Sequence, residues 1–408
     1  MLGLMHLVSL QQAAGVESHF AEFVRHAARR YPEWTQGWLN PARTMHPFLR
    51  EQLQPTLVHT IDAKHRWHIK LPSKPDWIRS WHCRRSFRAT GTNVVLIWNR
   101  TAKTGFVLDA IGADNCIHWE HGAAWDKGRE RERERYLHRI PLAIANSRAA
   151  ARVLQLHWGF RGDIRICLNA LRPSLRPQGL VAKRYPTDAA IKLGVAARLF
   201  PVKGVALALH AAKLLNAAAV NVELHIAGAG PELPRLQSLA RDLNIASICH
   251  FRGAVADMRR FYHDIDCLLH PPLTEAFGLV AIEAAAHGCP VIAAAVDGLP
   301  EAVEDGVSGY CVAPTLPLAA YAELGGALQG IPAYVYDSAS DSLHEPRIVD
   351  PSALAAAVRR LFAGRETYEG MSRSASAHVS RRFDFDAHVD DVMSVIDAFV
   401  RPSRRQRQ

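Results

Sequence analysis

The fold of this chain is decided by one stretch, Pro271-Pro272-Leu273-Thr274-Glu275-Ala276-Phe277-Gly278-Leu279-Val280-Ala281-Ile282-Glu283. It joins an apolar strand, residues 267–269, to an Ala-rich helix that we expect to begin near Gly278, and its two carboxylates stand eight positions apart. Glycine lets a ligand approach the backbone closely, and the unpaired N–H groups of a helix start favour a phosphate. The stretch predicts a ligand site in which Glu283 reaches a sugar or ribose hydroxyl and Glu275 faces the group attached to the phosphate. The alternative is a buried helix with two structural glutamates.

The segments on either side of this stretch alternate between apolar strands and helical patterns. Strands are predicted at residues 4–9, 57–61, 94–98, 115–119 and 142–145 in the first half, and at 191–196, 222–227, 248–251, 266–269 and 290–294 in the second. Such alternation is typical of parallel sheets with helices on both faces. We therefore predict an α/β chain of two Rossmann-like, doubly wound domains.

The length of 408 residues also favours two domains, because single cores rarely grow so large. Residues 176–188 are rich in Pro and charge and lack periodicity, so we expect a linker there. The predicted division is residues 1–185, 186–383, and a C-terminal helix with a basic tail at 384–408. Residues 315–349 have no clear pattern and are expected to be a specificity element or partly disordered.

Composition narrows the class of protein. With 49% hydrophobic and 22% charged residues, the chain is expected to be globular, and it has neither a run typical of a membrane-spanning helix nor the pattern of a signal peptide. The seven Cys are scattered without a CxxC motif, which is typical of reduced thiols in a cytoplasmic protein. We therefore expect a cytoplasmic location.

Charge is divided unevenly along the chain. Residues 1–184 carry 29 Lys and Arg against 14 Asp and Glu, and all nine Trp lie in the same part. Stretches that mix Trp with basic residues, at 67–70 and 77–85, suit an anionic membrane surface or an acidic acceptor. Nucleic acid is the rival partner, but no binding motif supports it, so we expect none. The simpler alternative is a basic domain with Trp in its core.

Candidate site residues in the first half follow a predicted strand. Strand ends are where doubly wound sheets place ligands, so His121, next to Gly122, is expected to contact one, whereas His118 and Glu120 are expected to pack or face solvent. A zinc site lacks a third ligand. The alternating Arg and Glu at residues 129–135 predict an exposed helix without chemistry.

In the second half, Arg198 and Lys203 lie in one loop between a strand and a helix, where an Arg fork and a Lys point charge can converge on a diphosphate. The alternative is a pair of surface cations. Gly228-Ala229-Gly230 is a weak signal by itself. The acidic triplet at residues 264–266 leads into a buried strand, so we expect no catalytic metal and no cofactor.

Taken together, these motifs resemble the retaining glycosyltransferases of GT-B architecture, in the large group 1 family that includes bacterial mannosyl- and glucosyltransferases and sucrose synthases. The resemblance covers nearly all of residues 190–313 and is carried by the segments at 194–204, 225–231, 275–283, 288–293, 298–303 and 306–310. It is thinner in the first half, where Gly15 resembles the N-terminal glycine loop but Ala14 replaces a usual second glycine. The resemblance implies two facing Rossmann-like domains and a last helix that crosses back to the first.

The same resemblance implies roles for individual residues. Arg198 and Lys203 would bind the donor diphosphate, Glu283 would hold the ribose hydroxyls, and Glu275 would contact the transferred sugar. The remaining donor contacts would come from Gly15, Gly228, Gly278, Leu279 and Val280, with His121 approaching the sugar from the first domain.

The expected function is that of a hexosyltransferase that uses a nucleotide-diphosphate sugar. It would act with retention on a glycan or glycolipid acceptor in lipopolysaccharide or other surface polysaccharide synthesis, at the inner face of the membrane. Two alternatives stay open: a nucleotide-sugar 2-epimerase of similar fold, which would change the donor without an acceptor, and a non-catalytic sugar-nucleotide-binding partner.

Overall fold

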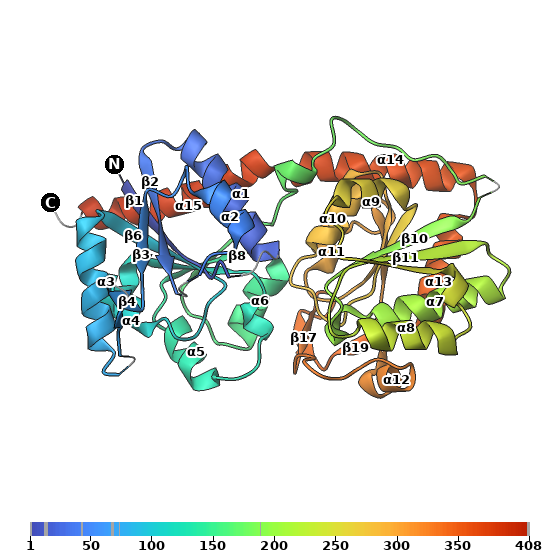
Figure 1. Ribbon diagram of the computed structural model, residues 1–408, viewed down its shortest axis with the longest axis horizontal. Helices are drawn as coiled ribbons and strands as arrows, with labels where there is room; N and C mark the ends of the chain where they lie inside the picture. Colours follow the sequence, from blue (N-terminus) through green and yellow to red (C-terminus); the bar gives the residue numbers. More distant parts are fainter. Residues whose placement is uncertain are drawn as a thin grey trace. The chain divides into compact units, whose positions relative to one another are not determined.

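The structure is a computed structural model that describes residues 2–11, 15–41, 44–66, 69–72, 74–187 and 189–405, with the backbone alone for 402–405. Trp67 and His68 of the first Trp-containing basic stretch, Asp188 of the predicted linker and residues 406–408 of the basic tail lie outside this part. The chain divides into two compact units, residues 1–168 with 385–408, and residues 169–384. Figure 1 shows each unit as a sheet with helices packed on it.

The first unit contains a seven-stranded parallel sheet of order β3-β2-β1-β6-β7-β8-β9. Its strands form from short apolar runs, and in β6 five consecutive residues are buried, as expected when helices cover both faces. The strands are β1 (Leu2–Leu7), β2 (Trp34–Asn40), β3 (His59–Asp62), β6 (Thr92–Trp98), β7 (Cys116–Glu120), β8 (Leu142–Ala145) and β9 (Asp163–Ile166), with a small hairpin of β4 (His65–Arg66) and β5 (Ile69–Lys70). The helices are α1 (Gly15–Arg30), α2 (Pro47–Leu53), α3 (Trp77–Ala89), α4 (Gly105–Ile111), α5 (Glu130–Leu137), α6 (Arg148–Leu156) and α15 (Phe385–Arg405).

The last helix, α15, belongs to this first unit. Arg30 of α1 donates to both carboxylate oxygens of Asp390, at 2.8 and 2.5 Å, and Tyr31 donates to the same carboxylate at 2.8 Å. The buried face of α15 carries Val389, Val392, Met393, Ile396 and Val400, whereas the predicted Val395 and Phe399 are half-buried. Val389, Val392 and Ile396 were thus predicted correctly, and the buried face extends toward Met393 and Val400 instead of Val395 and Phe399.

The second unit contains a six-stranded parallel sheet of order β12-β11-β10-β13-β14-β15. Figure 1 shows α9, α10 and α14 on one side of this sheet and α7 and α8 on the other. The strands are β10 (Ile191–Ala196), β11 (Val222–Ala227), β12 (Cys249–Gly253), β13 (Cys267–His270), β14 (Val291–Ala294) and β15 (Gly309–Val312). The helices are α7 (Val205–Ala217), α8 (Leu233–Asp242), α9 (Met258–Asp264), α10 (Leu279–Ala286), α11 (Leu299–Ala302), α13 (Pro351–Leu361) and α14 (Arg365–Arg382).

The division between the units lies at residues 168 and 169, which is 17 positions before the predicted end of the first domain at 185. The intervening segment packs on the second unit. The Leu171 N–H donates to the Phe383 carbonyl at 3.0 Å, and the Val181 N–H donates to the Ser376 hydroxyl at 3.0 Å. The Pro and polar residues of this segment predicted a linker. Its hydrogen bonds join residues far apart in the sequence, so they leave no periodic pattern in the sequence.

Residues 315–349 have regular structure rather than disorder. They include strands β16 (Pro314–Pro317) and β19 (Arg347–Val349), which pair with each other, the helix α12 (Leu318–Glu323), and the hairpin of β17 (Val335–Asp337) and β18 (Ser342–His344). Tyr321 of α12 is buried and donates to the Pro201 carbonyl at 2.8 Å. The segment is therefore fastened to the loop that follows β10.

Among the described helices, none combines the length and the apolar character that a membrane-spanning segment needs.

Candidate functional site

The candidate site of the second unit is centred on an ion pair between two predicted site residues. Lys203, at the end of the loop between β10 and α7, places its Nζ 2.7 Å from Oε2 of Glu275, in the loop after β13. Nε2 of the buried His270 lies 3.6 Å from the same oxygen. Burial alone would raise the pKa of Glu275, but the charge of Lys203 and the neighbouring His270 hold it well below its usual range. Glu275 is therefore ionised at physiological pH.

The loop that carries Glu275 is held by Asp297, a buried residue that follows β14. Its Oδ2 accepts hydrogen bonds from the Thr274 hydroxyl at 2.7 Å and from the Glu275 N–H at 3.0 Å. Its Oδ1 accepts from the Tyr336 N–H in β17 at 2.7 Å. One carboxylate thus ties the Glu275 loop to the hairpin within residues 315–349.

Arg198 is positioned by close backbone approach between two loops. The Leu199 N–H donates to the Ala229 carbonyl at 2.9 Å. A Cβ on Gly228 would stand 1.8 Å from the Ala197 carbonyl oxygen, and Gly228 has a φ of +149°, so only glycine fits there. Arg198 is exposed, with its guanidinium carbon 5.3 Å from the ring centre of Phe200. The described contacts bring Lys203 to Glu275 but show no contact between Arg198 and that pair.

The start of α10 lies directly after this loop. Gly278 has a φ of +103°, and a Cβ there would stand 2.4 Å from the side chain of Leu299. The N–H groups of Leu279 and Val280 open the helix, where no carbonyl precedes them within the helix to accept their hydrogen bonds. These amides, with the positive end of the helix dipole, suit an anion.

Glu283, predicted to hold ribose hydroxyls, is buried and already hydrogen-bonded within the protein. Arg172 donates to its Oε1 at 2.8 Å, and the Tyr262 hydroxyl donates to its Oε2 at 2.8 Å. A carboxylate can accept about four hydrogen bonds, so capacity for a ligand hydroxyl remains. Sequence reasoning missed both partners because they lie 111 and 21 positions away from Glu283.

His121 belongs to the first unit, directly after β7. Its ring stacks on Trp98, with centroids 5.3 Å apart and planes 3° apart, and its Nε2 has no hydrogen-bond partner in the described part of the chain. Burial, assisted by the electrostatic influence of His388 and His118, lowers the pKa of His121 to about 3. His121 is therefore a neutral imidazole with a buried nitrogen that has no hydrogen-bond partner among the described residues.

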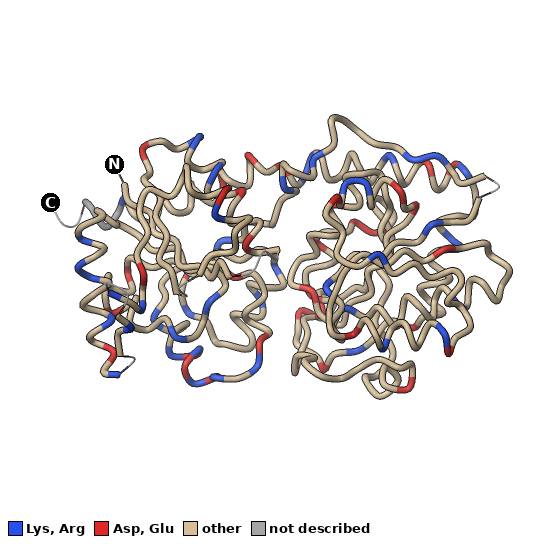
Figure 2. The backbone as a smooth tube through the Cα atoms, viewed as in Figure 1, with Lys and Arg blue, Asp and Glu red and all other residues tan. Residues whose placement is uncertain are grey.

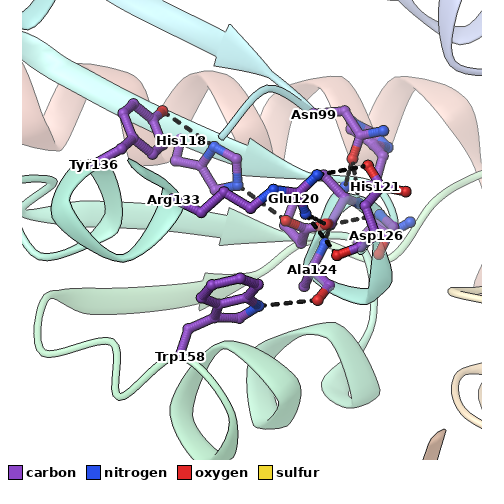
Figure 3. Close-up of polar contacts among 12 residues, drawn as sticks. Asn99, His118, Glu120, His121, Ala124, Asp126, Arg133, Tyr136 and Trp158 are labelled. Atoms are coloured by element: carbon purple, nitrogen blue, oxygen red, sulfur yellow. Dashed lines mark hydrogen bonds and ion pairs between the residues drawn. The ribbon is translucent and has the colours of Figure 1, made fainter. Parts of the chain in front are cut away.

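The loop after His121 is built around the buried carboxylate of Glu120 (Figure 3). Its Oε1 accepts from the N–H groups of Gly122 at 2.6 Å and Ala124 at 3.0 Å, and its Oε2 lies 3.0 Å from Nε2 of His118. The Tyr136 hydroxyl lies 3.3 Å from the other ring nitrogen of His118. Glu120 and His118 therefore pack rather than face solvent, and they shape the loop that carries His121.

Two more side chains complete this loop. The side-chain oxygen of Asn99 accepts from the N–H groups of His121 at 2.9 Å and Ala123 at 2.8 Å. Arg133 donates to the carbonyls of Ala123 at 3.0 Å and Asp126 at 2.8 Å. The expectation of an exposed helix at residues 129–135 was thus wrong for Arg133, which is 7% exposed. The available signal was its spacing of three and four residues from the buried Tyr136 and Leu137.

Gly15, the remaining predicted donor contact, is exposed and is the first residue of α1. Residues 12–14 of the predicted glycine loop, including Ala14, lie outside the described part.

Comparison with known proteins places these features in a family. The model of the family "Glycosyl transferases group 1" matches residues 186–324, which contain Lys203, Glu275 and Glu283. The second unit is therefore similar to the group 1 glycosyltransferases. A D-inositol 3-phosphate glycosyltransferase of Streptomyces griseus is 33% identical over 251 residues, or 58% of this chain and 46% of the relative. The corresponding protein of Streptomyces bingchenggensis is 33% identical over 256 residues, covering 58% and 55%. The chain spans about half the length of these curated relatives.

Solved structures show the fold of the whole chain. A glycosyltransferase of Rickettsia africae superposes with a TM-score of 0.75 at 15% identity, covering 98% of both chains. Alr3699/HepE of Anabaena, in complex with UDP and glucose, gives a TM-score of 0.70 at 17% identity and covers 97% of this chain and 99% of its own. WaaG, a glycosyltransferase involved in lipopolysaccharide biosynthesis, gives 0.65 at 14% identity, covering 97% and 99%. The chain has the GT-B fold.

A possible cation site in the second unit lies away from the Lys203–Glu275 pair. Among the described residues, the ligand atoms of Glu223, His225 and His250, on β11 and β12, lie close enough together to hold a metal ion. The Arg252 guanidinium lies 2.9 Å from Nδ1 of His225. A metal-binding His normally donates its second ring N–H, so a cationic donor at that nitrogen opposes metal binding. In the predicted acidic triplet, Asp266 accepts from the Lys192 N–H at 2.8 Å, which is a structural contact.

Proposed function

We propose that the protein is a hexosyltransferase that moves a sugar from a nucleotide-diphosphate donor to a glycan or glycolipid acceptor with retention. The observation that carries the proposal is the Lys203–Glu275 pair, 2.7 Å apart and next to the open start of α10, within the domain that matches the family. Breaking the sugar–phosphate bond leaves positive charge on the anomeric carbon and negative charge on the diphosphate. Fixed groups that oppose these charges lower the barrier.

Lys203, with Arg198 from the same loop, would neutralise the negative charge of the diphosphate. In the structure Lys203 forms an ion pair with Glu275. A bound diphosphate would therefore interact with an ammonium group that also contacts Glu275, and not with an unpaired cation. The amides of Leu279 and Val280 would add hydrogen bonds to phosphate or sugar oxygen. The ionised Glu275 would accept from sugar hydroxyls and stabilise the developing positive charge.

Glu283 and His121 would orient the two ends of the donor. Glu283 is held between Arg172 and Tyr262, so it would present its remaining acceptor capacity to ribose in a fixed direction. His121, neutral because of its lowered pKa, would exchange a hydrogen bond with the sugar and would not carry charge. No metal is required in this scheme, since Lys, Arg and helix amides face the phosphates.

For the acceptor we propose a surface glycan such as lipopolysaccharide, reached at the inner face of the cytoplasmic membrane. The support is α3, where Trp77 and Trp81 are 66% and 47% exposed on a helix that also carries Arg84, Arg85 and Arg88. Exposed Trp beside Arg suits the interface of an anionic membrane. The similar proteins differ in what they act on: the Streptomyces relatives are D-inositol 3-phosphate glycosyltransferases, whereas WaaG is involved in lipopolysaccharide biosynthesis.

The first test is thermal stabilisation by UDP, GDP, ADP and their sugar conjugates without added metal. A ligand that binds the native state raises its melting temperature by mass action. We expect one nucleotide to stabilise wild type, a smaller shift in Lys203→Ala, and a full shift in Lys213→Ala, an exposed Lys of α7 in the same domain. No stabilisation at millimolar concentration would remove the support for a donor site.

Turnover then separates the alternatives. A donor changed in the absence of any acceptor would indicate an epimerase, and a donor that binds without turning over would indicate a binding partner. Retention is tested by the anomeric configuration of the product, observed by NMR.

A further inference from the structure

The first unit contains a large basic cavity that the donor site does not use. It has a volume of about 980 Å³ and lies among the β4–β5 hairpin, α3, α4 and α5. Figure 2 shows basic positions recurring along α3 and α5. Eight Lys and Arg line the cavity against three Asp and Glu, so its charge is strongly positive.

Most of this positive charge is not neutralised by the protein. Of the three acids, Asp109 already pairs with Arg139 at 2.6 Å, and Glu132 pairs with Arg129 at 3.2 Å. The six other basic residues face one remaining acid, Asp76, and none of the ion pairs found among the described residues involves them; they are Lys64, Lys70, Lys74, Arg79, Lys103 and Arg135. A concave surface lined by one sign of charge focuses the field and concentrates counter-ions.

The crowding is greatest around Lys64. This side chain is half-buried, and its pKa is lowered by burial and then by the charges of Arg100, Arg79 and Lys103, against which Asp62 is a weaker influence. Like charges that lie close together in a partly buried site repel one another and raise the free energy, unless an anion binds between them. An anion bound beside Lys64 would therefore gain the most favourable electrostatic interaction.

The cavity reaches the same edge of the sheet as His121. Lys64 stands two residues after β3, Lys103 five residues after β6, and His121 directly after β7. All three strands are members of one parallel sheet, so their carboxyl ends share one edge. Ligands of doubly wound sheets bind outside that edge.

We propose that this cavity binds a phosphate group carried by the acceptor, with Lys64, Arg79 and Lys103 as its principal contacts. A phosphate monoester carries nearly two negative charges and three acceptor oxygens, which matches a cluster of Lys and Arg without ion pairs, although Arg79 also donates to the Leu71 carbonyl at 2.9 Å. The phosphate can belong to a soluble phosphosugar or to a lipid headgroup. Calling the ligand the acceptor rests on the proposed transferase function, whereas the binding of phosphate does not.

The test measures binding by the full chain without donor. Glucose 6-phosphate serves as the soluble probe, with glucose as its uncharged match, and phosphatidylcholine vesicles with and without phosphatidic acid serve as the lipid probe. We expect the double variant Lys64→Ala, Lys103→Ala to bind the phosphorylated probe at least about tenfold more weakly, since charge-assisted hydrogen bonds are lost. Lys127→Ala, an exposed Lys of the same unit outside the cavity, should bind as wild type does.

The outcomes distinguish a soluble phosphosugar from a lipid headgroup, and they distinguish a failure of the phosphate site from a failure of the donor site. Loss confined to glucose 6-phosphate identifies a soluble acceptor, and loss confined to phosphatidic acid vesicles identifies a lipid one. Equal binding of glucose and glucose 6-phosphate together with equal binding of both vesicle types, or equal weakening in Lys127→Ala, overturns the inference. The thermal shift induced by the panel of UDP, GDP and ADP is measured on the same variants: it should persist in the double variant, which also shows that the variant is folded. Its absence in wild type would count against the donor site and leave the phosphate result standing.

Discussion

The carboxylate of Asp297 offers the sharpest test of how the loop that carries Glu275 is held. Asp297 is 1% exposed and has a φ of +48°, and its two oxygens accept three hydrogen bonds, from Thr274, Glu275 and Tyr336. Asn tolerates the same left-handed backbone, so Asp297→Asn changes the chemistry and keeps the conformation. Its amide can accept from Tyr336 N–H, but its NH₂ group then meets the Glu275 N–H as a second donor.

The expected cost follows from the unsatisfied groups. One buried N–H without an acceptor costs about 1–3 kcal/mol, so Asp297→Asn should lower the free energy of unfolding of the second unit by about that amount. Asp297→Ala leaves all three donors without an acceptor, at about 1–3 kcal/mol each, and adds about 1–2 kcal/mol of left-handed strain, for a total of roughly 4–11 kcal/mol. For a unit of this size, each kcal/mol lowers the melting temperature by about 2–4 °C.

The chain provides an internal control for the assay. All nine Trp lie between residues 34 and 158, so Trp fluorescence reports the first unit alone, whereas far-UV circular dichroism follows both units. The melting transition seen by circular dichroism should fall in the order wild type, Asn variant, Ala variant, and donor turnover should fall with it because Glu275 loses its support. An Asn variant that melts as wild type does, or an Ala variant no less stable than the Asn variant, would refute the reasoning.

Three further predictions concern charge. Glu120 has a lowered pKa, because the His118 contact and two N–H groups outweigh the effect of its burial. Its contribution to stability is therefore complete above the pKa of the unfolded state, 4.5, and is lost as pH falls through the pKa of the folded state. Glu120→Gln should weaken this acid dependence of the melting temperature measured by Trp fluorescence, and an unchanged dependence on pH would contradict the prediction. His121→Ala should lower kcat, yet the wild-type pH–rate profile should show no step from His121 between pH 5 and 8, because its pKa is about 3; a step there that disappears in the variant would show that the imidazole titrates. EDTA should leave donor turnover unchanged, and activity restored only by added divalent metal would disprove a metal-free site.

The fold and half of the candidate site were predictable because their signals are local. Apolar runs of strand length, each followed by a helical period, identified the strands β8, β10 and β11 to the residue. The strand β2 went unpredicted, since Thr35, Gln36 and Gly37 interrupt its apolar pattern although Gln36 is buried. Its polar side chain is satisfied by His6, 30 positions away, at 3.0 Å.

The sequence by itself determined the two parallel-sheet units, the loop and helix around Glu275 and Glu283, and the position of Lys203 in the loop between a strand and a helix. These follow from glycine conformations and residue spacing, which act within a few positions. Tertiary structure decided the rest: Asp297 joins the Glu275 loop to residues 315–349, Arg172 reaches Glu283 across 111 positions, and Arg133 turns from an apparent surface charge into a support for the His121 loop. Buried polar groups must find partners wherever the chain brings them, and periodicity does not encode which distant partner that will be.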